Sequence, residues 1–362
     1  MIHSSTPQDE PAPGIEAKLR FLQSPASHPE CRGEVSWIET HMSWLFFVGE
    51  HVLKLKKPVR YPFLDFSTLA ARELYCREEL RLNSRLAPDV YLGLLALQYQ
   101  DGSFALVPRA RLPQAGQTVD WLVLMRRLPE RRMLHRSIDD GCVGSADIAA
   151  LVSVLAAFYR QVPAVEVSAA DYLARFQREL AASREVLLRP QFQLHDVTPA
   201  LDRLDLALSR HADLLKERAA QGHIVDGHGD LRPDHVCLLQ PPVVIDCLEF
   251  NASLRQVDPF DELAFLALEC AMAGAAWIGP QLIAGCAAAL GDTPGAALLQ
   301  LYTAHRAVLR ARLAMAHLLD PQPRTPPRWP PLAQRYVERA LVALDAIERT
   351  TVISGSTSHG SP

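Results

Sequence analysis

The stretch that most constrains this chain is 228–251, HGDLRPDHVCLLQPPVVIDCLEFN. Two short apolar runs, 236–239 and 243–245, flank a Gln-Pro-Pro segment, and this pattern indicates an antiparallel β-hairpin. If the turn is tight, His235 and Asp246 lie opposite each other at the open end, because cross-strand neighbours have Cβ atoms about 4.5–5.5 Å apart. The two prolines allow that register to shift by a residue or two.

Several carboxylates belong to this stretch. Asp230 lies just before the hairpin, in a turn that Gly229 and Pro233 favour. We expect Asp230, Asp246 and a further acid, Glu249, to converge at the open end. Clustered carboxylates repel one another unless a cation lies among them, and Mg²⁺ suits oxygen ligands while leaving room for phosphate oxygens. Each acid alone is typical of a turn or a helix cap, but the joint spacing favours a functional site.

The remainder of the chain divides into a strand-rich part and a helical part. The 362 residues are 49% hydrophobic, which is enough to bury the cores of two lobes. Helices are expected at 15–23 and 68–86, hairpins at 44–55 and 90–108, and a strand at 119–125. Helical periodicity then dominates 146–160, 171–188, 200–218 and 259–318, and a proline-rich linker at 321–331 precedes a last helix at 332–349.

These elements predict an α+β fold with four segments. Residues 1–14 and the tail 351–362 have polar, disorder-prone compositions. Residues 15–128 are expected to form a small strand-rich lobe, and 129–350 a larger helical lobe.

Composition argues against several classes of partner. The net charge of −4 and the absence of a basic run disfavour nucleic acid. The most apolar stretch, Leu263 to Cys286, contains Glu269 and is interrupted by Gly279-Pro280, so we expect two buried helices rather than a membrane span. Seven scattered cysteines without a C-x-x-C pair are typical of reduced thiols and predict a cytoplasmic protein.

The motif H-G-D-L-x-P-x-x-V, followed by V-V-I-D, resembles the aminoglycoside phosphotransferase-like kinases, which share the protein-kinase fold. The resemblance implies a two-lobed fold in which 15–128 is the nucleotide-binding lobe and 129–350 contains the catalytic loop and metal site. In this fold Asp230 is the catalytic base and Asp246 binds the metal. It also implies supporting roles for His228 and for Asp261 of the D-P-F-D-E-L-A motif. Asp261 is expected to start a helix and brace the catalytic loop, which is compatible with a helix N-cap.

Two positions depart from the family pattern. His235 stands where the family has Asn as second metal ligand, and Arg232 stands where many relatives have His. An imidazole suits Mn²⁺ better than Mg²⁺, so His235 is expected either to bind the metal or only to hydrogen-bond the loop. Further motifs of the chain resemble those of an uncharacterised bacterial branch of the family. In some relatives of that branch the kinase-like domain is fused to a P-loop ATPase. No G-x-x-x-x-G-K-[ST] motif occurs here, so that second module is not expected.

The first lobe must supply a cation for the phosphates. Side chains alternate along a strand, so Lys54 and Lys56 point the same way. The strand Val52-Leu53-Lys54 resembles the lysine strand of the family, which favours Lys54. On the next helix, Glu79 shares a face with Leu82 and is the expected partner of Lys54, with Glu78 as the alternative.

Two further segments complete the expected nucleotide site. The loop Thr40–Trp44 contains no glycine, and it is expected either to place Ser43 and backbone N–H groups on the phosphates or to be a plain turn. Met125 and Arg126 begin the expected hinge, whose backbone groups would bind the base.

The sequence therefore predicts an enzyme that transfers the γ-phosphoryl of ATP, or of another nucleoside triphosphate, to a hydroxyl of a small molecule. Mg²⁺ is the expected metal, with Mn²⁺ possible because of His235. The alternative is a non-catalytic, pseudokinase-like nucleotide-binding module that acts through a partner. A metal hydrolase using His228, Asp230 and His235 is weaker, because a second ligand cluster is missing. No motif identifies the acceptor: Glu269 and Asp292 either meet a cationic substrate or face solvent.

Overall fold

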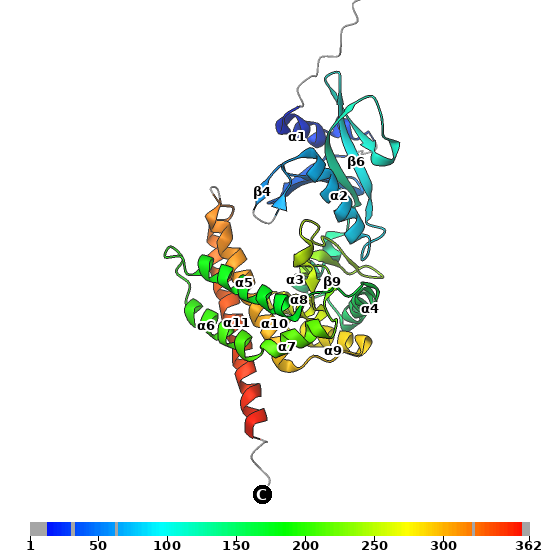
Figure 1. Cartoon of the computed structure of the whole chain (residues 1–362). Helices are drawn as coiled ribbons and strands as arrows, with labels where there is room; N and C mark the ends of the chain where they lie inside the picture. The colour runs from blue at the N-terminus through cyan, green and yellow to red at the C-terminus, as the bar shows by residue number, and fades with distance from the viewer. Residues whose placement is uncertain (1–12, 30–32, 62–63, 321–322, 357–362) are drawn as a thin grey trace, which may run out of the picture. The chain divides into compact units, whose positions relative to one another are not determined.

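The computed structural model describes residues 13–29, 33–61, 64–320 and 323–356, with side chains through 349. Residues 1–12 and 357–362, which fall in the segments expected to be disordered, lie outside the described residues. The chain divides into two compact units. The N-terminal unit is Met1–Glu130 with Val244–Asn251, and the C-terminal unit is Arg131–Val243 with Ala252–Pro362. Each unit can be followed by colour and label in Figure 1.

The N-terminal unit is built on a six-stranded antiparallel sheet with the order β1-β2-β3-β8-β6-β7. Its strands are β1 (Ser36–Glu39), β2 (Ser43–Val48), β3 (His51–Lys56), β6 (Tyr91–Gln100), β7 (Ser103–Pro108) and β8 (Gln117–Arg126), and β4 (Arg60–Tyr61) pairs separately with β5 (Leu64–Asp65). Its helices are α1 (Ile15–Gln23) and α2 (Leu69–Asn83), both labelled in Figure 1.

Tight turns fix the register of this sheet. β2 and β3 are joined by Gly49-Glu50, where Gly49 has a φ of 57°. Asp101 and Gly102 join β6 to β7 with φ values of 50° and 78°, as a two-residue turn of the I′ type requires. Both hairpins predicted for this unit are confirmed. On one face, Leu22 of α1 packs in a core with Trp44, Phe46 and other apolar residues of the strands.

The C-terminal unit is mainly helical. Short strands accompany the helices: β9 (Val225–Asp226) pairs with β12 (Gln256–Val257), and β10 (Val236–Cys237) pairs with β11 (Val243–Val244), at which the unit boundary falls. The helices are α3 (Leu134–Asp139), α4 (Ser145–Gln161), α5 (Ala169–Leu187), α6 (Val197–Arg210), α7 (Ala212–Ala220), α8 (Pro259–Met272), α9 (Ile278–Leu290), α10 (Ala296–Ala316) and α11 (Trp329–Ser356).

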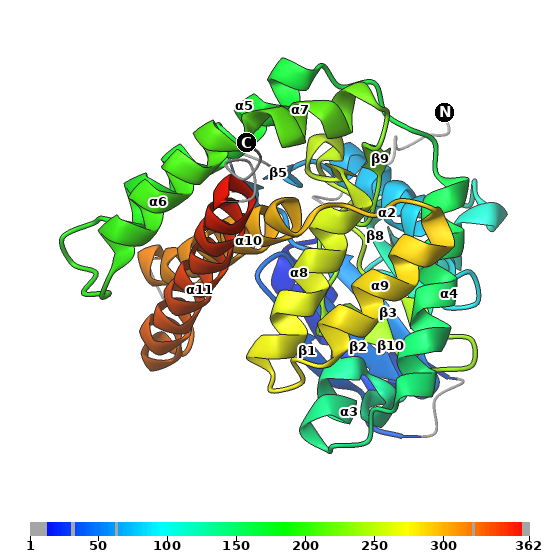
Figure 2. The same ribbon diagram turned by 90° about the horizontal axis from the view of Figure 1, so that it is seen from below.

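Helix α8 is the centre of this unit. Phe260, Leu263 and Leu266 on it are fully buried. It packs against α9 and α10, while α10 packs along α11 and α9 against α4. Figure 2 shows α8 beside α9 and the pair α10 and α11 lying side by side. The predicted α+β architecture is therefore confirmed, with strands in the first unit and helices in the second.

Three helix boundaries differ from the sequence-based prediction. The segment 200–218 is two helices, because the chain breaks at His211 between α6 and α7. The apolar stretch breaks at 273–277, and Gly279-Pro280 instead lies in the first turn of α9. Helix α11 begins within the expected proline-rich linker and continues to Ser356, so the start of the tail that was expected to be disordered is helical. Proline is tolerated in a first helical turn because the N–H it lacks has no intrahelical partner there.

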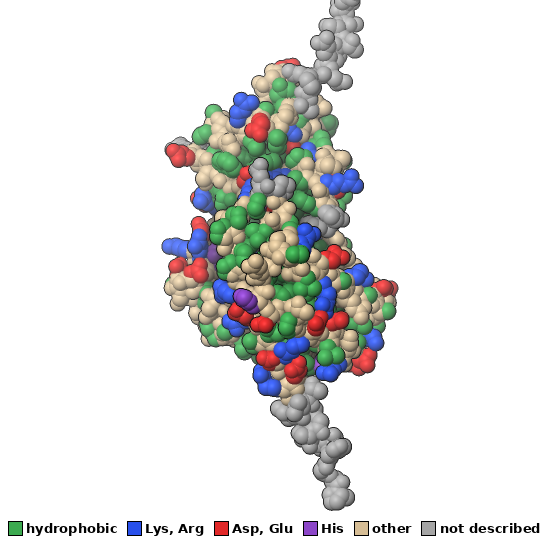
Figure 3. Space-filling model, turned by 90° about the vertical axis from the view of Figure 1, so that its left-hand side faces the viewer, with side chains coloured by type: hydrophobic (Ala, Val, Ile, Leu, Met, Phe, Trp, Pro, Cys, Tyr) green, Lys and Arg blue, Asp and Glu red, His purple; other side chains and the backbone are tan. Residues whose placement is uncertain are grey.

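On the face drawn in Figure 3, Lys and Arg side chains are interspersed with Asp and Glu side chains. Among the described residues, no helix combines the length and the apolar character that crossing a bilayer requires.

Candidate active site

The N-terminal unit brings Lys54 of β3 between two carboxylates. Its Nζ lies 2.8 Å from Oε1 of Glu79 on α2 and 2.8 Å from Oδ1 of Asp246. Burial by itself lowers the pKa of Lys54, but Asp246 and Glu79 outweigh it and raise that pKa well above the usual value. Lys54 is therefore a fixed cation held by one acid from the helix and one from the segment after β11.

A second lysine lies behind the first. Lys56 is fully buried, its Nζ lies 2.5 Å from Oε2 of Glu79, and it also pairs with Glu249. Glu79 thus bridges the two lysines, and their charges hold its pKa below the usual value despite its burial. For Glu249 burial dominates, and its pKa is raised. Lys54 and Lys56 do point the same way along β3, as strand alternation predicts.

The segment carrying Asp246 is fastened to the N-terminal unit. Asp246 adopts a left-handed backbone with a φ of 62°, and its N–H donates to the Tyr91 hydroxyl at 3.1 Å. The N–H of Cys247 donates to Oδ1 of Asn83 at 2.8 Å, and Asn83 itself donates to the carbonyl of Glu79 at 2.9 Å. These contacts explain why Val244–Asn251 belongs to this unit, although the sequence placed it in the helical lobe.

The alternative partner, Glu78, lies elsewhere. It forms an ion pair with Arg81 at 2.7 Å on an accessible part of α2. Glu79 is fully buried. Of the two consecutive acids, the structure places Glu79 against Lys54.

In the expected phosphate loop and hinge, many backbone groups already form hydrogen bonds within the N-terminal unit. The N–H of Ser43 donates to Oγ1 of Thr40 at 3.0 Å, and the N–H of Thr40 donates to the Ser43 carbonyl at 2.8 Å. Met125 pairs with Val52 and Tyr91 within the sheet. The N–H of Arg126 donates to the Val90 carbonyl at 2.8 Å. A base at this hinge would therefore have to use groups other than the Arg126 N–H, and the roles of these residues stay predictions.

The H-G-D loop in the C-terminal unit is held by a buried carboxylate that the sequence did not single out. Glu262 of α8 accepts hydrogen bonds from the backbone N–H of His228 at 2.9 Å and from that of Gly229. The hydroxyl of Tyr159 on α4 donates to the same carboxylate at 2.9 Å. Burial raises the pKa of Glu262 against these hydrogen bonds. The loop is thereby tied to α8 through its main chain.

Asp230 follows in the same loop and lies among basic side chains. Nε of Arg232 lies 3.0 Å from Oδ1 and 3.1 Å from Oδ2 of Asp230. Burial raises the pKa of the Asp230 carboxyl, but Arg232, His235 and Arg310 outweigh it and leave the pKa below the usual value. Asp230 is thus an ionised, partly exposed carboxylate. The N–H of Asp230 lies 3.3 Å from Nδ1 of the buried His228, which supports the loop from within.

His235 is committed to this loop by both ring nitrogens. Its Nδ1 lies 2.8 Å from the Asp230 carbonyl, and its Nε2 lies 3.2 Å from Nη2 of Arg232. Because a guanidinium only donates, Nε2 must accept and Nδ1 must carry the proton. The geometry favours the loop-bonding alternative over metal ligation. The expected pairing of His235 with Asp246 stays a prediction, since the two residues belong to different units.

The acid that braces the H-G-D loop is Glu262 and not, as predicted, Asp261. Asp261 is buried and binds Nε and Nη2 of Arg306 on α10 at 2.7 and 2.6 Å. The N-cap of α8 is Asp258, which accepts from the Phe260 N–H at 2.8 Å and binds Arg218. Within the D-P-F-D-E-L-A motif, Asp258 therefore caps α8, Asp261 forms an ion pair and Glu262 braces the loop.

Two other acids considered as contacts for a cationic substrate are already paired. Glu269 accepts from Nε of Arg310 at 3.1 Å and from the Tyr336 hydroxyl at 2.6 Å. Asp292 binds Nη2 of Arg218 at 2.6 Å. Neither simply faces solvent.

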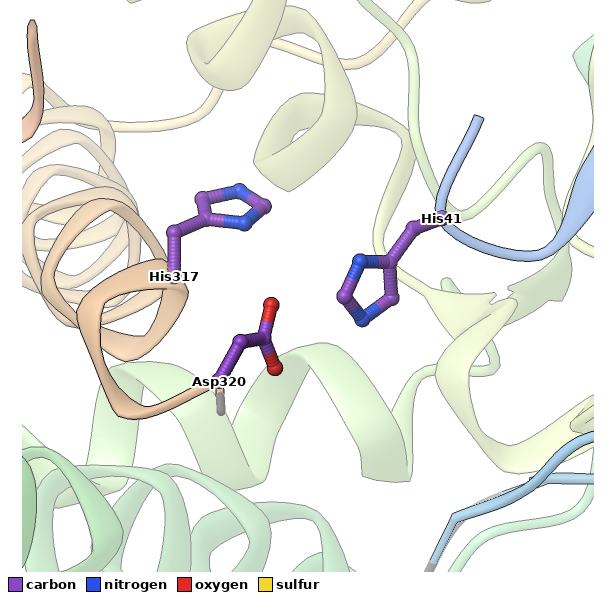
Figure 4. A group of neighbouring side chains, drawn as sticks. All are labelled: His41, His317 and Asp320. Atoms are coloured by element: carbon purple, nitrogen blue, oxygen red, sulfur yellow. The ribbon is translucent and has the colours of Figure 1, made fainter. Parts of the chain in front are cut away.

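Three more titratable side chains are drawn in Figure 4. His317 and Asp320 follow α10, and the His317 ring stacks on Trp329 with centroids 4.1 Å apart. His41 lies in the turn before β2, where its ring stacks on Tyr61 with centroids 5.4 Å apart. Since His41 and the other two residues come from different units, no metal site is assigned to them.

No protein-family model matches the chain. Uncharacterised proteins of Mycobacterium tuberculosis and Mycobacterium bovis are each 30% identical to it over 321 residues, which is 87% of this chain. The chain spans only 60% of the length of these curated relatives. The expected fusion to a P-loop ATPase in relatives stays a prediction.

Solved structures resemble the chain over most of its length. Choline kinase from Cryptosporidium parvum has a TM-score of 0.56 at 10% identity and covers 94% of this chain and 99% of its own. A choline/ethanolamine kinase family protein from Mesorhizobium loti has a TM-score of 0.53 at 14% identity, covering 92% and 98%. A thermostable aminoglycoside phosphotransferase in a ternary complex with AMP-PNP and hygromycin B has a TM-score of 0.50 at 12% identity, covering 90% and 97%.

The fold and these likenesses define the class. The chain has the two-lobed, protein-kinase-like fold that aminoglycoside phosphotransferases and choline/ethanolamine kinases share. The predicted resemblance to the aminoglycoside phosphotransferase-like fold is confirmed.

Proposed function

We propose that this chain is an ATP-dependent phosphotransferase that transfers the γ-phosphoryl group to a hydroxyl of a small molecule. The observation that carries the proposal is the position of Lys54, 2.8 Å from both Glu79 and Asp246. A buried lysine fixed between a helix acid and a metal-binding acid is the arrangement that phosphate binding in this fold requires.

The N-terminal unit supplies the phosphate and metal contacts in this proposal. Lys54 binds phosphate oxygens, and Glu79 fixes its position. Asp246 offers a hard carboxylate donor, half exposed at 46%, which fits Mg²⁺. The bound metal would neutralise charge on the phosphates. Mn²⁺ was considered because an imidazole of His235 could bind it, but both ring nitrogens of His235 are engaged in the loop. Mg²⁺ is therefore the metal of this proposal.

The C-terminal unit supplies the base. The acceptor oxygen forms a bond to the γ-phosphorus, the bond from that phosphorus to the β-phosphate oxygen breaks, and ADP leaves. The hydroxyl proton passes to Asp230, which its cationic neighbours keep ionised. Glu262 holds the loop so that Asp230 keeps its place. Such catalysis is mostly positioning and electrostatic stabilisation.

The likenesses to known proteins support the class of reaction. The solved structures with this fold include small-molecule kinases, and one of them holds AMP-PNP together with hygromycin B. ATP and a small-molecule acceptor are accordingly the first ligands to test.

The test measures AMP-PNP–Mg²⁺ binding by thermal shift, and ADP formation with a panel of alcohols. Lys54→Met should abolish the thermal shift, and Asp246→Asn should lower turnover at least about 100-fold. Lys57→Met is the matched control, because Lys57 pairs with Glu39 and takes no part in the cluster. Full turnover by Asp246→Asn would refute the assignment.

One observation favours the non-catalytic alternative. His235 replaces the family's Asn and is bound to Arg232 and to the Asp230 carbonyl, so only Asp246 remains as a metal ligand from the predicted pair. A chain that binds AMP-PNP–Mg²⁺ through Lys54 but forms no ADP with any alcohol would support the pseudokinase-like module. Restored turnover in His235→Asn would identify this residue as the cause.

A further inference from the structure

Arg310 in the C-terminal unit is oriented by three helices. It lies on α10, and its Nε donates to Oε1 of Glu269 on α8 at 3.1 Å. The Tyr336 hydroxyl on α11 donates to the same oxygen at 2.6 Å. The guanidinium lies over the rings of Phe265 and Tyr336, at 5.9 and 5.6 Å from their centroids. Its plane and direction are therefore set before any ligand arrives.

The two terminal nitrogens of Arg310 are not used by this anchoring. Among the described residues, the hydrogen bonds of Arg310 involve Nε alone. Neither Nη1 nor Nη2 is a fully buried atom. The side chain is nevertheless only 19% exposed. A guanidinium offers five donors in a rigid fork that matches a carboxylate or phosphate with two parallel hydrogen bonds. Arg310 thus presents a fixed pair of donor nitrogens on a side chain that is only partly accessible.

The other arginines of α10 differ in this respect. Arg306, one turn earlier, gives both Nε and Nη2 to Asp261. Arg312 gives Nη2 to Glu179 at 2.5 Å. Both of these arginines therefore bind their acids through a terminal nitrogen. Arg310 instead meets its acid through Nε, which leaves the terminal pair for another anion.

Arg310 also lies close to the proposed base. Its charge is among those that lower the pKa of the Asp230 carboxyl, after Arg232 and His235. Arg232 contacts Asp230 directly at 3.0 Å. The 3-10 turn Pro233–His235, which follows Asp230, packs against α8, the helix that carries Phe265 and Glu269. Two guanidinium groups therefore act on the base in this unit, and each is paired with a carboxylate, Arg232 with Asp230 and Arg310 with Glu269.

A guanidinium with two unused donor nitrogens suits an acceptor that carries an anion. The ammonium groups of an amino alcohol or an aminoglycoside only donate, so they cannot accept the two hydrogen bonds that the fork of Arg310 offers. A hydroxy acid or a phosphorylated alcohol would be attracted, and its anion would fit the fork.

We propose that Arg310 binds the carboxylate or phosphate of the acceptor, so that the substrate is an anionic alcohol rather than an aminoglycoside or an amino alcohol. The proposal rests on the phosphotransferase function above. Arg310 positions the acceptor so that its hydroxyl meets Asp230, and the transferred group and proton move as already described.

The test measures binding directly, so that it does not depend on turnover. The full-length chain is titrated calorimetrically with D-glycerate, glycerol 3-phosphate and choline. At least one of the two anions should bind and choline should not, and the stronger anion identifies carboxylate or phosphate as the recognised group. Arg310→Lys keeps the charge but removes the fork, and should weaken anion binding at least about tenfold. Arg335→Gln is the control, because this exposed arginine binds the Met272 carbonyl and should leave the affinity unchanged.

A folding defect is kept separate by the double variant Arg310→Gln/Glu269→Gln, which removes both charges and keeps a neutral pair. It should unfold near the wild-type temperature and still lose the anion. Equal anion affinity in wild type and Arg310→Lys, absence of binding by both anions, or binding of choline alone would overturn the inference. Failure of the phosphotransferase proposal appears in a different measurement, as loss of the Lys54-dependent AMP-PNP–Mg²⁺ thermal shift.

Discussion

The carboxylate of Glu262 lies 2.9 Å from the backbone nitrogen of His228, across 34 positions of sequence. Through this contact the buried start of α8 fixes the main chain of the H-G-D loop two residues before Asp230. The geometry of the proposed base therefore depends on a residue that does not touch the substrate.

Replacing Glu262 by Gln should impair both stability and turnover. The amide keeps one acceptor oxygen but turns a donor toward groups that also donate, which leaves a buried polar group unsatisfied at a cost of about 1–3 kcal/mol. Urea unfolding should show that loss. Tyr159→Phe, which removes one neutral donor to the same carboxylate, is the milder comparison at about 1 kcal/mol. Equal stability of Glu262→Gln and wild type would exclude the bracing role.

Gly227 should tolerate no side chain. A Cβ at this position would lie 2.6 Å from Oε2 of Glu262 and 2.7 Å from Cγ2 of Val257. Gly227→Ala should therefore push Glu262 from the loop, cost about 1–3 kcal/mol, and lower ADP formation more than the folded fraction explains. Gly295→Ala is the control, since a Cβ there meets nothing within 4 Å. An unfolding midpoint for Gly227→Ala as high as that of the control would contradict this prediction.

Glu262 also shows which parts of the site can be predicted from the sequence and which cannot. Asp261 and Glu262 are consecutive, and the motif alone does not say which of them faces the loop and which faces α10. The sequence favours Glu79 over Glu78 because Leu82, three positions after Glu79, marks the inner face of α2. Helix α8 offers no such guide, because Asp261 and Glu262 are both buried, on a helix that is buried on nearly every side.

Other features were missed for comparable reasons. β1 is an edge strand with Trp37 and Ile38 largely exposed, so it has no inward-facing alternation to reveal it. The break at His211 carries no Gly or Pro signal. The pairing of Asp246 with Tyr91 depends on contacts 155 positions apart, which no local pattern encodes. Hairpins, by contrast, were readable because Gly49 and the Asp101-Gly102 pair supply the positive φ values of the turns.

Lys56 should matter for folding. Lys56→Met leaves Glu249 and Glu79 buried with one cation fewer, and breaking a buried pair in this way typically costs about 3–5 kcal/mol. Lys57→Met, on the neighbouring residue, should cost far less. The double variant Lys56→Met/Glu249→Gln should recover part of the loss, because it removes the uncompensated charge. No difference between the two single variants in denaturant unfolding would disprove the assignment of Lys56 to the core.

His305 should make stability depend on pH. It is buried in α10 against Phe176, with ring centroids 4.6 Å apart, and among the described residues neither ring nitrogen has a hydrogen-bond partner. Burial lowers the pKa of His305 to about 3, with Asp261 opposing this shift and Arg306 reinforcing it. An unfolded histidine has a pKa near 6.5, so the unfolded chain binds a proton that the folded chain refuses between these two values. The penalty is absent above about pH 6.5 and grows by about 1.4 kcal/mol per pH unit below it.

His305→Leu removes that proton and the two unsatisfied nitrogens while keeping an apolar side chain of similar size. The variant should be at least as stable as wild type at pH 8, and its advantage should widen as the pH falls to 5, measured by urea unfolding at several pH values. His195→Leu, at an exposed position, should follow the wild-type curve. Parallel pH curves for His305→Leu and wild type would mean that His305 takes up its proton in the folded state, and the core around Phe176 would then have to supply an acceptor for it.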